Sequence, residues 1–345
     1  MPDDAGPGVA QPRGLLVAVA IVIVLASVRA ATTIVVPVII AVLVTVVAAP
    51  FQQRLIARGM HRLGAFGTVL AATSVIVAGF FWAVDLSLSA FLADLPSYAP
   101  GAEQLLTDTL NLGKSMHLDF THLVSVGTLV SRTFTEADTL TRSILSSIAG
   151  WVIALTLTGF MLHEALDFPG KVRSLLKDDS QFNRLAAFAR DLSGSMAIMT
   201  VGAALTAAGD LGVLVVLGVP SALLWAALAF LLSYIPSIGS IIIVIPPTIA
   251  TLVRFGLARA LLVLVLMLVI DNVVGILIVP RLVRRRLDIT PLWGMLSLVF
   301  WGWLLGPAGA ILAIPLTMLA KFLLESSPVT TPLARLMAPV RVTDT

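Results

Sequence analysis

One apolar segment of this chain is interrupted at its centre by residues that break helices. The sequence Tyr-Ile-Pro-Ser-Ile-Gly-Ser at 234–240 stands between two apolar runs at 221–233 and 241–253. Each run is shorter than the roughly 20 residues that a helix needs to cross a bilayer. Polar and helix-breaking residues are tolerated at membrane depth only where protein or a water-filled cavity surrounds the freed backbone. The pattern therefore predicts a helical hairpin that turns within the membrane.

A second segment has the same character. The sequence Gly-Pro-Ala-Gly at 306–309 separates the apolar runs 291–305 and 310–324. A pair of interrupted segments in corresponding halves of a membrane protein is typical of a transport site. We therefore expect two broken or re-entrant hairpins in an inverted arrangement, the first entering from outside and the second from inside.

The composition indicates an all-α polytopic membrane protein. Of the 345 residues, 58% are hydrophobic and 12% are charged, against roughly 25% charged residues in soluble domains. The chain has no Cys, which excludes thiol catalysis and Cys-ligated metal sites. The sequence also has no Walker-type phosphate loop and no metal-ligand spacing of His, Asp and Glu. We therefore expect neither a cofactor nor an enzymatic activity.

The distribution of apolar runs and charges predicts six regions. Asp and Glu dominate the third region, and its apolar residues recur at helical spacing. The regions are a disordered tail (1–12), N-terminal transmembrane helices (13–84), an external amphipathic helical segment (85–142), a transmembrane helix with a cytoplasmic helical segment (143–193), a transport unit with both hairpins (194–325) and a cytoplasmic tail (326–345).

The basic residues predict the orientation. Arg54, Arg58 and Arg62 form an acid-free basic loop, and a second one follows at 280–286. Short cytoplasmic loops carry an excess of Lys and Arg. If both termini lie in the cytoplasm, most of the 22 Lys and Arg lie on the cytoplasmic side of the membrane. There we expect them to contact the lipid headgroups. If both hairpins crossed the membrane fully, their ends would lie on the same sides of the membrane as the ends of re-entrant hairpins. The distribution of charges therefore does not distinguish re-entrant from crossing hairpins.

Two predicted spans contain acidic residues. Asp210 lies deep in the small-residue span 195–217, and Asp271-Asn272 lies in the middle of 257–279. A charge at the bilayer centre costs about 2.5–3.5 kcal/mol on insertion scales, so such residues face a cavity or a partner. They are candidates for a proton or sodium pathway, or for binding a hydroxyl-rich solute. The structural alternative is that they hydrogen-bond within helix contacts.

The two interruptions supply the other candidate binding groups. Half-helices that begin after each interruption direct the positive ends of their dipoles towards the site, which favours polar or anionic groups there. The alternative is that Pro and Gly only form the turns. The candidates at the interruptions are Tyr234, Ser237, Gly239, Ser240, Gly306 and Gly309.

Several motifs resemble the autoinducer-2 exporter family of transporters. They are Gly-Val-Pro-Ser-Ala-Leu-Leu-Trp-Ala at 218–226, Tyr-Ile-Pro-Ser-Ile-Gly at 234–239, Pro280-Arg281 followed by Leu287 and Pro291, and the run 297–309 with Ile-Pro-Leu-Thr at 314–317. The resemblance is sharp over 195–325. It implies a bacterial inner-membrane homo-oligomer, a pentamer, that exports the furanosyl signal autoinducer-2 by an elevator-like movement. Other members look like sodium/proton antiporters.

The sequence departs from the family pattern at Ala203, Asp210 and Arg284, which places an identical substrate in doubt. Three functions are therefore considered. The first is export of a small polar solute such as autoinducer-2. The second is cation/proton antiport, favoured by the two intramembrane acids. The third is a non-transporting scaffold, which the interrupted hairpins argue against because a scaffold needs no unwound backbone in the bilayer.

Overall fold

The computed structural model describes residues 13–98, 100–101, 103–104, 107, 150–176, 178–235, 239–282, 290–327 and 330–337. Every regular element in these ranges is helical, which confirms the all-α prediction. The elements are α1 (Arg13–Ala30), α2 (Thr32–Ala57), α3 (Arg62–Asp94), η1 (Leu95–Tyr98), a helix at Gly150–Glu164, α6 (Phe168–Leu175), α7 (Asp179–Val216), α8 (Ala222–Leu232), α9 (Gly239–Phe255), α10 (Leu257–Asn272), the π-helix η2 (Val273–Ile278), α11 (Val279–Leu282), α12 (Pro291–Leu305), α13 (Pro307–Ile311), α14 (Ala313–Glu325) and α15 (Thr331–Met337).

Four helical segments within these ranges are long and apolar enough to cross a membrane. They are Thr32–Ala57, Arg62–Tyr98, Asp179–Val216 and Leu257–Ile278. A fifth span is complete if Gly150–Glu164 and Phe168–Leu175, which are bent by 67° relative to each other, count as one. The chain is therefore a polytopic membrane protein, as predicted.

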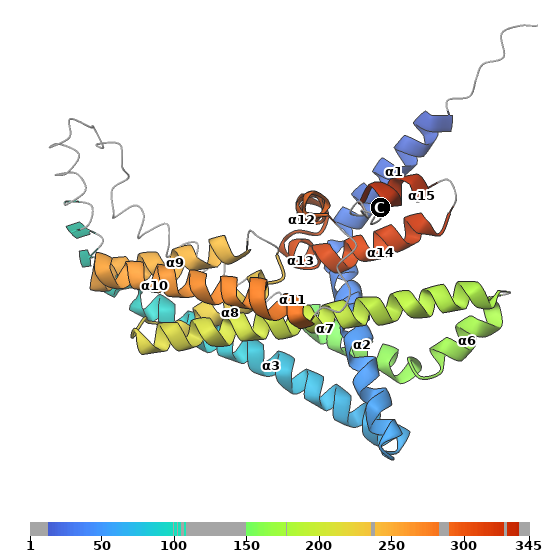
Figure 1. Cartoon of the computed structure of the whole chain (residues 1–345), viewed down its shortest axis with the longest axis horizontal. Coiled ribbons are helices and arrows are strands. Elements are labelled where there is room, and N and C mark those ends of the chain that lie inside the picture. The colour runs from blue at the N-terminus through green and yellow to red at the C-terminus, as the bar shows by residue number, and fades with distance from the viewer. Residues whose placement is uncertain are drawn as a thin grey trace, which may run out of the picture.

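Helix α7 is the element along which both interrupted segments pack (Figure 1). The Asp178 side chain caps its start by accepting a hydrogen bond from the Ser180 backbone N–H at 2.8 Å. The hydrogen bond from the Ser180 hydroxyl, together with this backbone bond, holds the pKa of Asp178 below its usual value. The helix then continues for 38 residues, through the predicted boundary between 193 and 194.

Helices α8 and α9 form the first interrupted segment, hairpin 1. They pack together and against α7 and α10. The shared core is almost entirely aliphatic and contains, among others, Leu214, Ala229, Val244, Val263 and Met267. Hairpin 1 is therefore built into a compact unit with the C-terminal half of α7.

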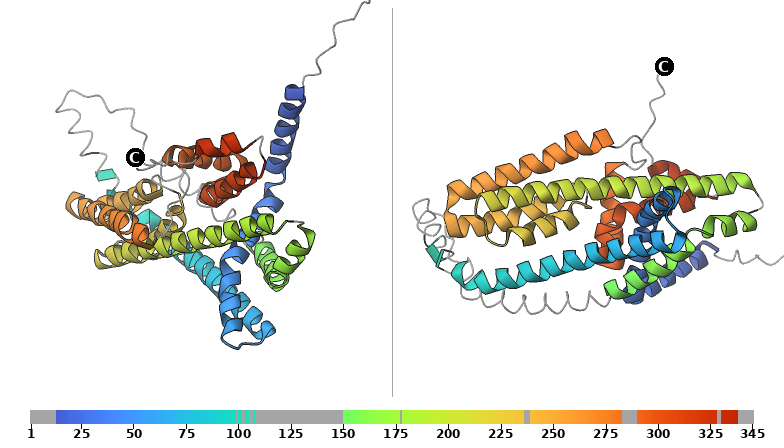
Figure 2. Two further views of the ribbon diagram at one scale, coloured as in Figure 1. Left: turned by 45° about the vertical axis from the view of Figure 1, so that its right-hand side comes forward. Right: turned by 90° about the horizontal axis from the view of Figure 1, so that it is seen from below.

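Helices α12, α13 and α14 form the second interrupted segment, hairpin 2. Its apolar side chains pack on α1 and α2 through Leu304, Leu305 and Leu316. It also packs on the first half of α7, where the Phe188 and Phe322 rings stack with centroids 4.2 Å apart. Helix α1 projects from the rest of the molecule beside hairpin 2 (Figure 2).

The two hairpins open towards opposite ends of α7. Hairpin 1 begins immediately after the C-terminal end of α7, at Ala222. The last helix of hairpin 2 ends beside the start of α7, where Arg184 Nη2 donates to the Glu325 carbonyl oxygen at 3.2 Å. This is the inverted arrangement expected from the sequence.

Several predictions fall on chain that the structure does not cover. The tail 1–12, Ser237, residues 283–286 of the basic loop with Arg284, and most of the predicted external segment 85–142 lie outside the described residues. Its first part belongs to α3, which continues as a helix to Asp94.

Candidate functional site

The tip of hairpin 1 depends on a glycine. Helix α9 begins at Gly239, which is buried against the end of α8. A Cβ at this position would lie 1.9 Å from the Leu232 carbonyl oxygen, well inside van der Waals contact. Only glycine therefore allows the two half-helices to approach this closely. Ser240, in the first turn of α9, is half-buried.

Tyr234 connects this tip to α7. Its hydroxyl lies 2.7 Å from the Thr200 hydroxyl. Thr200 donates its own proton to the Met196 carbonyl oxygen at 2.8 Å. A hydroxyl has a single proton to donate, so Tyr234 is the donor to Thr200. The tip is thereby positioned about midway along α7.

The tip of hairpin 2 is built in the same manner. A Cβ at the buried Gly309 would lie 2.0 Å from the Trp301 carbonyl oxygen. Gly306 has a φ of +71°, a conformation that glycine adopts readily. The two arms of the hairpin are joined where Trp301 Nε1 donates to Thr317 Oγ1 at 3.0 Å. Each interruption thus contains a glycine pressed against a carbonyl of the preceding half-helix.

Both tips reach the same stretch of α7. Met196 packs in one cluster with Leu312 and Met318 of hairpin 2. One helical turn later, Thr200 bonds Tyr234 of hairpin 1. Residues from two segments far apart in the sequence therefore pack on one stretch of α7, at positions one helical turn apart.

Asp210 lies farther along α7 and is completely buried, with an exposed fraction of 0%. Neither of its carboxylate oxygens has a hydrogen-bond partner among the described residues. The preceding residue, Gly209, faces Ile270 of α10, and a Cβ there would lie 2.7 Å from Ile270 Cγ2. The small residue allows α7 and α10 to meet at this point. Asp210 is thus an acid without a described hydrogen-bond partner inside a tight helix contact.

Asp271 follows Ile270 on the facing helix. It is half-buried, and its buried Oδ2 has no hydrogen-bond partner within the described part of the chain. The Asp210 and Asp271 carboxyl groups interact electrostatically across the α7–α10 contact. Two acids with no ion pair among the described residues are suited to binding a proton or a monovalent cation.

Asn272 has a different role from its neighbour. Its side chain is exposed and donates to the Leu268 carbonyl oxygen of its own helix at 2.7 Å. Such a side-chain bond competes with the backbone ladder, and the π-helix η2 begins at the next residue. π-Turns inside helices are frequent at functional sites. The residue types alone did not indicate this π-helix.

The candidates fall into two groups. Tyr234, Gly239, Ser240, Gly306 and Gly309 lie at the hairpin tips. Asp210 lies ten residues along α7 from Thr200, about 15 Å at 1.5 Å per residue, and Asp271 lies beside it on α10. Sequence reasoning missed Thr200 and Thr317. Thr317 ends the motif at 314–317, but the motif does not indicate its bond to Trp301, and no local pattern marks Thr200, because their partners are 16 and 34 residues away.

Comparison with known proteins finds transport proteins that match nearly the whole chain. The sequence profile of the AI-2E family transporters matches residues 15–328. The putative transport protein YhhT of Escherichia coli is 31% identical over 95% of this chain and 94% of its own length. The AI-2 transport protein TqsA of Escherichia coli is 30% identical over 89% of this chain and 90% of its own. A putative transport protein of Haemophilus influenzae is 30% identical over 95% and 97%, respectively.

Proposed function

The chain belongs to the AI-2E family of transporters, and on this premise we propose that it is a secondary transporter that exports a small polar solute of the autoinducer-2 kind. One observation carries the proposal: two glycine-closed hairpins open towards opposite ends of α7, and each packs on α7 at the turn between Met196 and Thr200. Interrupted helices of this kind place free backbone groups at membrane depth, where they can bind solute.

The tips supply chemistry that suits a polyhydroxylated solute. The Tyr234 and Thr200 hydroxyls, the Ser240 hydroxyl and the N-terminal backbone of α9 all lie near the first tip. A relative of similar length carries AI-2 transport in its name. Alternating access follows if hairpin 1, α10 and the adjoining part of α7 move as a body against the remaining helices, which is an elevator-like movement. No catalytic step or cofactor is required.

The transport proposal is tested with purified protein in proteoliposomes. Labelled autoinducer-2 accumulation should exceed that of empty liposomes, and Tyr234→Phe should reduce it because the tip loses its bond to Thr200. Thr156→Val, which removes an exposed hydroxyl that donates to the Val152 carbonyl oxygen of its own helix, is the control. Accumulation equal to that of empty liposomes for every polar solute in a screen would refute secondary transport.

A specific observation also favours cation/proton antiport as a second candidate function. The two carboxyl groups between α7 and α10 have buried oxygens without hydrogen-bond partners in the described chain. Sodium-dependent proton movement across proteoliposomes without any solute would support antiport. Solute transport that is insensitive to sodium would support the exporter instead.

We expect a bacterial inner-membrane protein with both termini in the cytoplasm that assembles as a homo-oligomer, a pentamer by family resemblance. Cysteines introduced at Gln53 and Leu282 should react only from the cytoplasmic side, and one at Gln104 only from outside. The native chain contains no Cys, so labelling has no background. Reaction of the Gln53→Cys variant with reagent added from outside would contradict the proposed orientation.

A further inference from the structure

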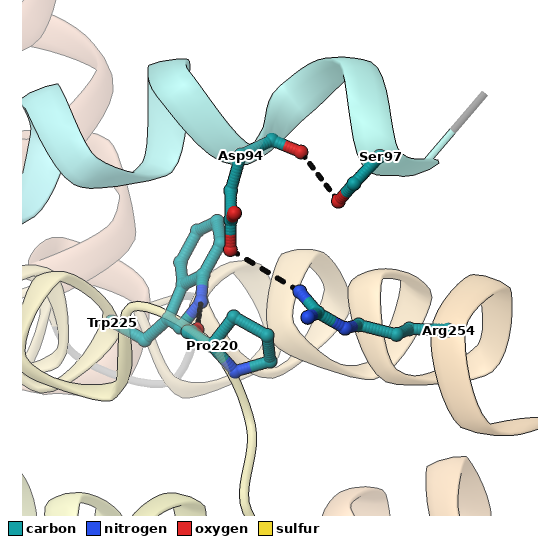
Figure 3. A network of polar contacts seen from close by, with 5 residues as sticks. All are labelled: Asp94, Ser97, Pro220, Trp225 and Arg254. Atoms are coloured by element: carbon teal, nitrogen blue, oxygen red, sulfur yellow. Dashed lines mark hydrogen bonds and ion pairs between the residues drawn. The ribbon is translucent and has the colours of Figure 1, made fainter.

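A small polar and aromatic network ties the end of α3 to the base of hairpin 1 (Figure 3). Arg254, in the last turn of α9, donates through Nη1 to Asp94 Oδ2 at 3.2 Å. Asp94 is the last residue of α3, and its carbonyl oxygen accepts a bond from the Ser97 hydroxyl at 2.7 Å. The two charged side chains are 48% and 40% exposed for Asp94 and Arg254, respectively, so water reaches the pair.

Aromatic rings continue the contact towards α8. Phe91 of α3 meets Trp225 edge to face, with ring centroids 5.3 Å apart. Trp225 is fixed in turn by donating from Nε1 to the Pro220 carbonyl oxygen at 3.2 Å. The network therefore holds both arms of hairpin 1 at their base, at the opposite end from the tip.

A close backbone approach completes the docking. A Cβ at Gly101 would lie 2.2 Å from the Val253 carbonyl oxygen. This part of the chain can therefore dock on the end of α9 only as long as residue 101 has no side chain.

The contact with α3 differs from the contacts on the other side of hairpin 1. Against α7 and α10 the hairpin buries an aliphatic core that includes Ile243, Val263 and Met267. Against α3 the contacts are aromatic and ionic: Phe91 packs on the buried Trp225 ring, Phe80 packs on Phe230, and Asp94 pairs with Arg254. The exposed ion pair is the part of this contact that costs least to break, because both charges regain water when they separate.

We propose that the Asp94–Arg254 ion pair is a reversible latch between α3 and hairpin 1. It holds hairpin 1 in the position seen here and opens when the hairpin moves. The latch rests on the proposed alternating-access movement. An exposed pair of this kind changes an equilibrium by a factor of up to about five, so it biases the two states without locking either.

The test uses a reporter cysteine at Ser240, in the cysteine-free chain reconstituted in liposomes. The measured quantity is the ratio of its modification rates by a membrane-impermeant thiol reagent applied from each side. Asp94→Asn, Arg254→Gln and Gly101→Ala should shift this ratio in the same direction, the charge variants by up to about fivefold. The exchanged pair, Asp94→Arg with Arg254→Asp, should return the ratio towards that of the parent.

Two variants serve as matched controls. Arg259→Gln removes a positive charge five residues beyond Arg254, and Asp85→Asn removes a negative charge earlier on α3. Neither should change the ratio. Parent-like ratios in Asp94→Asn and Arg254→Gln, or an exchanged pair that shifts the ratio further, would overturn the latch.

The same reporter separates failure of the latch from failure of the proposed function. If autoinducer-2 shifts the ratio in the parent but the latch variants behave like the parent, the hairpin moves and the latch is wrong. If the latch variants shift the ratio while autoinducer-2 does not, the latch stands and the proposed substrate is wrong.

Discussion

Asp271→Asn is expected to reduce transport more than tenfold and to flatten its dependence on pH. The carboxyl group lies within a membrane-spanning helix with its Oδ2 buried and without a hydrogen-bond partner in the described chain. An uncompensated charge at such a depth is costly, so ionisation of Asp271 must be coupled to what occupies the site. Asparagine keeps the shape of the side chain and its capacity to hydrogen-bond but cannot release a proton.

Proteoliposome transport at several pH values measures this effect, with expression level and oligomer size as controls for folding. Asn272→Ala is the matched variant at the neighbouring position, because Asn272 is exposed and bonds only its own helix among the described contacts. We expect it to retain the pH profile. A normal profile in Asp271→Asn would remove Asp271 from the mechanism and leave the hairpin tips as the binding site.

The substitution Asp210→Asn distinguishes a role of the Asp210 charge from a role of its side chain in packing α7 against α10. Asp210 is fully buried without a hydrogen-bond partner in the described chain. Removing its charge should leave the thermal stability of the detergent-solubilised protein unchanged or raise it. Transport should fall by a similar or smaller factor than in Asp271→Asn, since Asp210 also lies in the contact between α7 and α10.

Gly239→Ala and Gly309→Ala are expected to abolish transport and to destabilise the protein. The new methyl groups would lie 1.9 Å and 2.0 Å from backbone carbonyl oxygens of the same hairpins. Backbone cannot yield as a flexible side chain does, so each hairpin has to open. Overpacking of this kind costs about 1–3 kcal/mol and occasionally more. We expect a lower melting temperature together with loss of solute accumulation.

Other helical glycines provide controls for these substitutions. A Cβ at Gly212 of α7 or Gly294 of α12 would meet nothing within 4 Å. Alanine there favours the helix by roughly 0.5–1 kcal/mol, so stability should be kept or raised. If Gly239→Ala transports as well as Gly212→Ala, the close approach at the tip is not required for function.

The sequence predicted the fold because the bilayer restricts the alternatives. Apolar runs of known length, interrupted at 234–240 and 306–309, lead directly to helices and hairpins. The inverted arrangement also followed from the number of crossings. Lengths were less predictable: α3 continues to Asp94 because helix propensity does not end where apolar character ends.

The candidate site was predictable in its residue types but not in its grouping. Asp210 and Asp271 were conspicuous as acids in apolar spans, and their proximity arises from the contact of Gly209 with Ile270. The bond between Tyr234 and Thr200 depends on how hairpin 1 packs along α7. Such contacts are set by tertiary packing, which no local pattern records.

The π-helix after Asp271 gives α10 a property that a regular helix lacks. Regular helices advance by about 100° per residue, and a π-turn contains one residue more than an α-turn. If η2 tightened into a regular helix, everything beyond it would rotate by roughly that angle relative to Asp271. Val279, which now packs against Gly202 of α7, would leave that position. The segment Val273–Ile278 is therefore a rotary joint, through which a change at one carboxyl group can turn the end of the helix at Val279–Leu282 without bending it.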